Sequence, residues 1–140
     1  MTRAPTSAWT LYLSLTLALS AAGPLWAAAS GEDLIATYQR LGAGPFDAGA
    51  GGRSWTQEQR PAGADGPRSC ANCHGADLTQ PGRHATTGKP IEPMAVSVNP
   101  KRLTDPAHTE KWFGRNCRWT LGRECTPQEK GDFVRLIQSR

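Results

Sequence analysis

The sequence predicts a small all-α fold, and three observations lead to this prediction. Stretches 31–42, 105–122 and 126–137 carry helix-capping signals and apolar residues at helical spacing. The segments between them are rich in glycine and proline and are expected to be irregular. The third observation is the run Cys70-Ala71-Asn72-Cys73-His74, in which two thiols two residues apart precede a histidine. This spacing is typical of covalent haem c attachment, with the histidine on the iron, so we expect the helices to surround one haem.

Residues 1–29 have the features of a secretory signal. Arg3 is the only charged side chain in this segment, and residues 11–19 form its apolar centre. A run of small residues ending at Ala29 suits signal peptidase, so we place cleavage there and expect residues 30–140 to form one exported, periplasmic domain. The alternative is an uncleaved membrane anchor, because the uncharged stretch is long enough to span a bilayer, although proline and hydroxyl residues interrupt it.

Charge and size narrow the class of protein further. The formal net charge of +4 is too mild to indicate nucleic-acid binding. A solvated surface and a basic patch for docking an acidic redox partner both remain open. A domain this small buries little apolar area, so an additional staple is expected. The haem supplies an apolar surface to pack against, and the remaining cysteines, Cys117 and Cys125, are candidates for a second staple.

The first expected helix covers residues 30–42. Ser30 is its expected N-cap, and the two acidic residues that follow suit the positive end of the helix dipole. Leu34, Tyr38 and Leu41 fall on one face and form its expected buried stripe.

The next segment, residues 43–68, is expected to be mostly irregular because glycine, alanine and proline dominate it. One helical turn is expected near residues 53–59. Phe46 and Trp55 are interpreted as core anchors or as a wall of the haem site.

A long loop is expected over residues 75–100, where prolines and glycines recur. Such a loop is unusual inside a compact domain, but here it would wrap the haem. We expect a backbone carbonyl in the range 90–93 to accept the ring N–H of His74, because a ligating histidine usually needs a partner that fixes its orientation.

The last two helices have clear start and stop signals. Asp105 is the expected cap of the first, Pro106 suits its first position, and Gly122 ends it. The second begins with the capping box Thr126-Pro127-Gln128-Glu129. Its expected buried stripe is Phe133, Leu136 and Ile137.

The residue opposite His74 on the iron decides whether the site shuttles electrons or also binds a small molecule. The candidates from the sequence are Met94, His84, His108, Asn99 and Asn116. Met94 ranks first from spacing alone, since thioether ligation is usual in electron-carrying cytochromes c. The two other histidines suit surface positions, and Asn99 suits a turn before proline.

A family resemblance changes this ranking. From residue 69 to 137 the sequence resembles the sphaeroides haem protein family of monohaem cytochromes c, the DUF1924 domain. The resemblance rests on four blocks: Ser69–Leu78, Thr87–Pro93, Glu110–Cys117 and Leu121–Lys130. It implies a small class I-like cytochrome c fold, in which the terminal helices and a distal helix surround one covalent haem c and a long loop wraps it.

The resemblance also implies site residues. Asn116 corresponds to the distal ligand of the oxidised iron, and Cys117 and Cys125 correspond to a disulfide pair. An amide oxygen is a weak donor, so it is expected to leave the iron on reduction and open the site to oxygen, nitric oxide or carbon monoxide. Trp112, one turn before Asn116, is expected to line the pocket or to be a core tryptophan. The implied redox partner is a dihaem cytochrome c or a membrane cytochrome b.

Two other functions compete with this prediction. An ordinary electron carrier would use His74 and Met94 as axial ligands. A zinc module would use Cys70, Cys73, Cys117 and Cys125, but four thiolates would have to survive export and His74 would have no role. No acid and base pair is placed by spacing, so we do not expect an enzyme, beyond a slow reduction of oxygen or nitric oxide.

Overall fold

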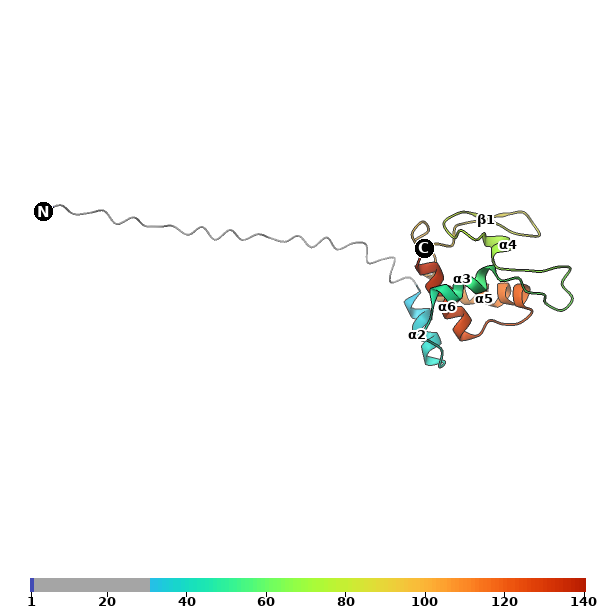
Figure 1. The fold of residues 1–140 in the computed structure, drawn as a ribbon, viewed down its shortest axis with the longest axis horizontal. Helices are drawn as coiled ribbons and strands as arrows, with labels where there is room; N and C mark the ends of the chain where they lie inside the picture. The colour runs from blue at the N-terminus through green and yellow to red at the C-terminus, as the bar shows by residue number, and fades with distance from the viewer. Residues whose placement is uncertain (2–30) are drawn as a thin grey trace.

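The computed structural model describes Met1 and residues 31–140, and its fold is mostly helical, as predicted. Its elements are helices α2 (Glu32–Arg40), α3 (Ala48–Thr56) and α4 (Ala71–His74), strands β1 (Gly82–Arg83) and β2 (Pro90–Ile91), and helices α5 (Pro106–Leu121) and α6 (Pro127–Gln138) (Figure 1). The strands pair antiparallel, with Gly82 opposite Ile91. None of the described helices is long and apolar enough to cross a membrane. The expected signal sequence and the Ser30 cap fall on residues outside the described part.

Helix α6 is the centre of the core, since both α2 and α3 pack against it. Its predicted stripe, Phe133, Leu136 and Ile137, is buried together with Val134. On α2 the prediction was partly wrong: Leu41 is 66% exposed, and its place in the core is taken by Ile35. Leu41 is the C-cap residue, so it follows the last helical turn and no longer obeys the helical period.

Helix α3 corrects the expectation of an irregular segment. It begins at Ala48 rather than near residue 53, because Asp47 caps it by accepting hydrogen bonds from the N–H groups of Gly49 (2.8 Å) and Ala50 (3.1 Å). Its glycines, which disfavour a helix by about 1 kcal/mol each, permit close packing: a Cβ on Gly51 would lie 2.3 Å from the carbonyl oxygen of Asp132 on α6. Tertiary contact thus outweighs local propensity here.

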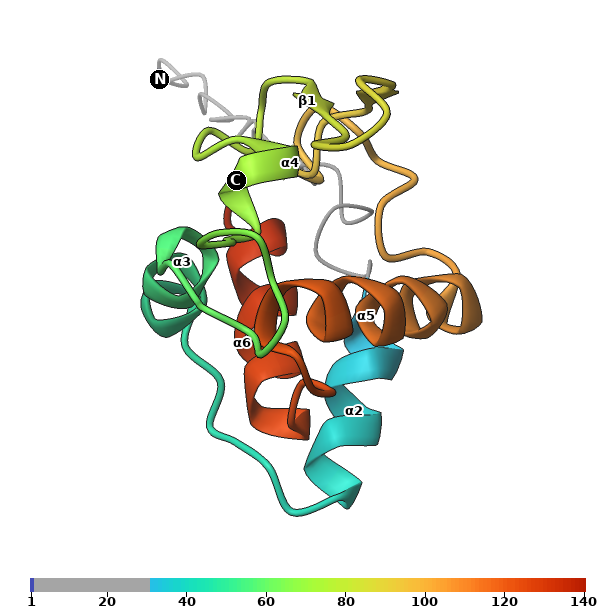
Figure 2. The same ribbon diagram turned by 90° about the vertical axis from the view of Figure 1, so that its right-hand side faces the viewer.

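The ends of α5 and α6 follow the predicted signals. Asp105 accepts a hydrogen bond from the backbone N–H of His108 at 2.9 Å, and Gly122 ends α5 in the left-handed conformation at φ 72°. Thr126 and Glu129 form the reciprocal capping box of α6. The short connection between the two helices therefore has a fixed geometry, which places α5 across α6 (Figure 2).

Candidate haem pocket

A cavity of about 720 Å³ lies among α4, α5, α6 and the loop over residues 84–103. This volume is within the range of roughly 300–1,000 Å³ that ligand and cofactor pockets occupy. In Figure 2, α4 and β1 lie above α5, and residues of both α4 and α5 line the cavity. The cavity is lined by all eight residues that the sequence predicts for the haem and the disulfide: Cys70, Cys73, His74, Met94, Trp112, Asn116, Cys117 and Cys125.

The first wall is α4, a single helical turn that carries the Cys-x-x-Cys-His run. The turn closes through a hydrogen bond from the N–H of His74 to the carbonyl of Cys70 at 3.1 Å. The hairpin backbone lies directly against it, since a Cβ on Gly82 would be 2.2 Å from the carbonyl oxygen of Cys73. Cys70 and Cys73 are both free cysteines that line the cavity. Burial raises the pKa of Cys70 to about 11, so its thiol stays protonated.

His74 is prepared to act as a metal ligand. Burial, with a smaller contribution from the charge of Arg102, lowers its pKa from 6.5 to about 4, so the imidazole is neutral. Its Nδ1 atom is buried and has no hydrogen-bond partner in the described part of the chain. The expected acceptor in residues 90–93 is therefore absent. The carbonyl of Pro93 instead accepts hydrogen bonds from Arg102 Nε (2.9 Å) and Asn99 Nδ2 (3.2 Å).

Trp55 supports His74 from behind. Its ring centroid lies 5.4 Å from that of His74, and its Nε1–H donates to the carbonyl of Gly75 at 2.8 Å. Gly75 ends α4, so this hydrogen bond fixes the helical turn that carries both cysteines. Trp55 is 5% exposed and also packs edge-on against Phe133 of α6. Trp55 is therefore both a core anchor and a wall of the pocket, the two positions that the sequence suggested for it.

The opposite wall is one face of α5. Residues at intervals of four line the cavity along this face: His108, Trp112, Asn116 and Thr120. The amide of Asn116 makes no hydrogen bond to any residue that the structure describes. Trp112 is 42% exposed, which excludes the interpretation as a core tryptophan. Its Nε1–H donates to Nε2 of His108 at 2.9 Å, and the guanidinium of Arg115 lies 5.1 Å from its ring.

The other candidate ligands also border the cavity, with differing availability. Met94 lines it and packs against the core, so both Met94 and Asn116 border the cavity. His84 Nδ1 accepts hydrogen bonds from the backbone N–H groups of Thr86 and Thr87 at 3.2 Å. The amide of Asn99 donates to Glu92 and to the backbone. These two side chains are occupied by loop contacts.

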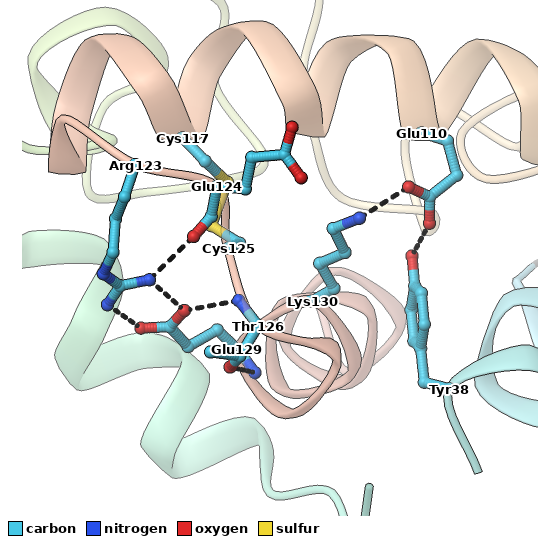
Figure 3. The surroundings of a disulfide bond; sticks show 9 residues. All are labelled: Tyr38, Glu110, Cys117, Arg123, Glu124, Cys125, Thr126, Glu129 and Lys130. Atoms are coloured by element: carbon cyan, nitrogen blue, oxygen red, sulfur yellow. Dashed lines mark hydrogen bonds and ion pairs between the residues drawn. A yellow bond between two sulfur atoms is a disulfide. The ribbon is translucent and has the colours of Figure 1, made fainter. Parts of the chain in front are cut away.

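Cys117 and Cys125 form a disulfide that joins the end of α5 to the residue before the α6 cap (Figure 3). Arg123 pairs with Glu129 beside it at 2.7 Å, and Arg118 pairs with Glu124. Two bonded sulfurs do not serve as thiolate ligands, so the four-cysteine zinc site is not formed. No group of three or more metal-ligating His, Cys, Asp or Glu side chains occurs among the described residues.

A second cluster holds α5 on the terminal helices. The hydroxyl of Tyr38 on α2 donates to Glu110 of α5 at 2.5 Å, and Lys130 of α6 donates to the other oxygen of the same carboxylate at 2.7 Å (Figure 3). Burial, followed by the Glu110 hydrogen bond, raises the pKa of Tyr38, so the phenol remains a donor. The wall that carries Asn116 is therefore attached at both ends, by this cluster and by the disulfide.

Cationic side chains outnumber acidic ones around the cavity. Lys89, Lys101, Arg102 and Arg115 border it, together with Glu92 and Asp105. Arg102 is partly buried, and this burial lowers its pKa. Cations at the edge of an apolar cavity suit a flat cofactor that carries carboxylates, as haem does with its propionates. Arg102 is not among the predicted site residues, because its position depends on the fold of the loop.

Comparison with known proteins decides the family. The family model described as a domain of unknown function, DUF1924, matches residues 42–137. The chain is 45% identical over 127 residues to the cytochrome c-type protein SHP of Cereibacter sphaeroides. The matched region covers 90% of this chain and 97% of that protein. This chain belongs to the DUF1924 family of SHP-like cytochromes c. The predicted family is confirmed. Cytochrome c'' of Methylophilus methylotrophus is 39% identical over 69 residues, 49% of this chain and 48% of that one.

Solved structures agree with this membership. The structure of oxidised SHP, described as an oxygen binding cytochrome c, matches with a TM-score of 0.73 and 43% identity over 79% of this chain and 97% of that one. Oxidised cytochrome c'' from Methylophilus methylotrophus matches with a TM-score of 0.66 and 29% identity, over 77% of this chain and 92% of that one. The class I-like cytochrome c fold is thereby confirmed.

The cofactor of an SHP-like cytochrome c is a covalent haem c, and the residues of this pocket fit it. Two free thiols and a neutral histidine with an unpartnered buried nitrogen share one wall of an apolar cavity of suitable size. The predicted cofactor is confirmed by the family. The assignment of individual ligands is a matter of proposal.

Proposed function

We propose that this protein is an exported, periplasmic monohaem cytochrome c that binds a diatomic gas in its reduced state and exchanges electrons with a redox protein. Cys70 and Cys73 hold the haem through thioether bonds, and His74 is the proximal ligand. Asn116 is the distal ligand of the oxidised iron and leaves it on reduction. The observation that carries the proposal is the Asn116 amide, which faces the cavity opposite α4 and has no hydrogen-bond partner among the described residues.

The properties of the side chains support these roles. When bound, the haem supplies an iron that changes between ferric and ferrous states and takes a sixth ligand. The amide oxygen of Asn116 is a hard, neutral donor, which favours the ferric state and holds the ferrous state weakly. Once released, the same side chain presents an N–H₂ donor beside the vacant position. Asn116 thus has one role in each oxidation state.

Neighbouring residues restrict how Asn116 moves. Cys117 follows it directly and is held to Cys125, while Glu110 fixes the preceding turns to α2 and α6. A backbone fixed on both sides leaves rotation of the Asn116 side chain as the route off the iron. A small movement of this kind needs no refolding of α5.

The relatives support gas binding, since the solved SHP is described as an oxygen binding cytochrome c. Oxygen, nitric oxide and carbon monoxide are the ligands we propose. A dihaem cytochrome c or a membrane cytochrome b remains the predicted redox partner. The proposed role is ligand binding and electron transfer. A slow reduction of bound oxygen or nitric oxide is the one catalytic activity that we include in the proposal.

Carbon monoxide tests the proposal, because it binds ferrous haem that has a weak or absent sixth ligand. We expect the absorption spectrum of the dithionite-reduced protein to change on addition of carbon monoxide, at concentrations near stoichiometric. The oxidised protein should not respond. A reduced spectrum that ignores saturating carbon monoxide would contradict gas binding.

The second candidate function is that of an ordinary electron carrier with His74 and Met94 as ligands. The observation that favours it is the position of Met94, which lines the same cavity and packs against the core. A Met94 thioether would hold the ferrous iron firmly. The carbon monoxide experiment separates the two, since this carrier would keep its reduced spectrum unchanged.

A further inference from the structure

Trp112 occupies an unusual position for a large aromatic side chain. It is 42% exposed, yet it lines the haem cavity one turn before Asn116. A side chain that contacts both solvent and the interior forms part of the rim. Because helical side chains lean toward the helix N-terminus, the Asn116 amide lies over the turn that carries Trp112. The indole therefore borders the part of the cavity next to the Asn116 amide.

Two contacts hold the indole in this position. Its Nε1–H donates to Nε2 of His108 at 2.9 Å, with the ring centroids 6.1 Å apart. The guanidinium of Arg115 lies 5.1 Å from the ring centroid. An exposed indole without such partners would exchange between rotamers on the nanosecond timescale. His108 accepts this hydrogen bond through Nε2, so that nitrogen carries no proton in this arrangement.

We infer that His108 is a positioning residue that holds Trp112 over the distal side of the haem pocket, so that the indole restricts access to small ligands. The inference rests on the proposed function, since it concerns access to the same distal site. Diatomic gases pass beside the fixed ring, whereas a bulkier ligand requires the ring to move. His108 thereby sets the size of ligand that reaches Asn116 without contacting the ligand itself.

The variant His108→Ala isolates this role. The cap of α5 remains, because it is the backbone N–H of residue 108 that donates to Asp105. His108→Gln is the rescue variant, since its amide oxygen keeps an acceptor at a similar reach. Lys111→Ala is the matched control: it removes an exposed side chain next to Trp112 on the same helix, outside the lining of the haem cavity.

The first readout is the association rate of two ligands with the reduced holoprotein after flash photolysis, carbon monoxide and n-butyl isocyanide. We expect His108→Ala to raise the isocyanide rate about fivefold, the equivalent of ~1 kcal/mol for one hydrogen bond, and to change the carbon monoxide rate less than twofold. His108→Gln and Lys111→Ala should stay near wild type. In a Trp112→Ala background, His108→Ala should have no further effect.

The second readout does not depend on ligand access. In ¹⁵N NMR spectra of the reduced protein, the indole N–H of Trp112, identified by its loss in Trp112→Phe, should exchange slowly with solvent in wild type and His108→Gln and rapidly in His108→Ala. Unchanged exchange in His108→Ala, or equal rate changes in the Ala and Gln variants, would overturn the inference. If no gas binds at all, the proposed function fails, while the exchange result still reports whether His108 holds Trp112.

Discussion

Two tryptophan–histidine pairs flank the haem cavity, and they differ in where the indole hydrogen bond goes. In the buried pair, Trp55 donates to the backbone carbonyl of Gly75 and lies 5.4 Å from His74 without bonding it. In the exposed pair, Trp112 donates directly to the imidazole of His108. The first arrangement leaves the histidine nitrogens free for a metal, and the second occupies one of them.

The two tryptophans also differ in how much of each side chain is exposed. Trp55 is 5% exposed and Trp112 is 42% exposed. A buried, rigid wall suits a ligand that must stay on the iron in both oxidation states, whereas a wall at the surface suits exchange with molecules from solution. Under the proposed function, the α4 side of the cavity would hold the cofactor and the α5 side would control what reaches it.

The largest expected effect comes from removing the two histidines in turn. His74→Ala should abolish stable haem incorporation, because it deletes the proximal ligand and part of the attachment motif. His108→Ala should retain the full haem content. Haem per protein, measured as the pyridine haemochrome of purified samples, checks both. Equal haem content in the two variants would contradict the different roles assigned to His74 and His108.

A smaller effect is expected on stability. Trp55→Phe removes the hydrogen bond to Gly75 and leaves space in the core, which should lower the free energy of unfolding by about 2–4 kcal/mol. Trp112→Phe should cost less than about 1 kcal/mol, because its ring is at the surface. Denaturant unfolding of the two holoproteins measures the difference, and similar losses would show that the two walls are equally rigid.

Much of this arrangement could be predicted because its signals are local. The caps of α5 and α6 depend on Asp105, Thr126 and Glu129, whose side chains bond backbone groups within three residues. The Cys-x-x-Cys-His run likewise predicts its own chemistry. Such contacts are present in the sequence before any tertiary structure forms.

The parts that were wrong depend on tertiary contact. Only one turn of α3 was predicted, near residues 53–59, because its glycines indicate an irregular chain; the close approach of the Asp132 backbone on α6 explains Gly51. The acceptor predicted for His74 in residues 90–93 is absent, and the carbonyl of Pro93 accepts from Arg102 and Asn99 through contacts that depend on the fold of the loop. The pairing of His108 with Trp112 follows from helical spacing, but the position of this pair on the cavity wall depends on how α5 packs. The preference for Asn116 over Met94 came from family resemblance rather than from spacing.

The smallest effect concerns acid. Glu129 lies at the junction of α5 and α6, and its pKa is lowered mainly by the Arg123 hydrogen bond, with the backbone N–H of Thr126 contributing. Because the folded pKa lies below the unfolded value of 4.5, this stabilisation is present above pH 4.5 and is lost as the pH falls through the folded pKa.

Glu129→Gln should therefore lower the free energy of unfolding by about 0.5–1 kcal/mol at neutral pH, given the partial exposure of the pair. At a pH below the folded pKa the variant and wild type should converge. Unfolding curves measured from pH 7 downward through the acid range follow this convergence. A difference that stays constant over the whole range would show that packing, rather than charge, is responsible.

The identity of the distal ligand is the central claim, and one paired measurement tests it most directly. Absorption and magnetic circular dichroism spectra of the oxidised holoprotein are compared for wild type, Asn116→Ala and Met94→Leu. We predict that Asn116→Ala converts the oxidised iron to a different coordination and spin state, while Met94→Leu leaves the spectra unchanged. A spectrum that responds to Met94→Leu and ignores Asn116→Ala would contradict the assignment.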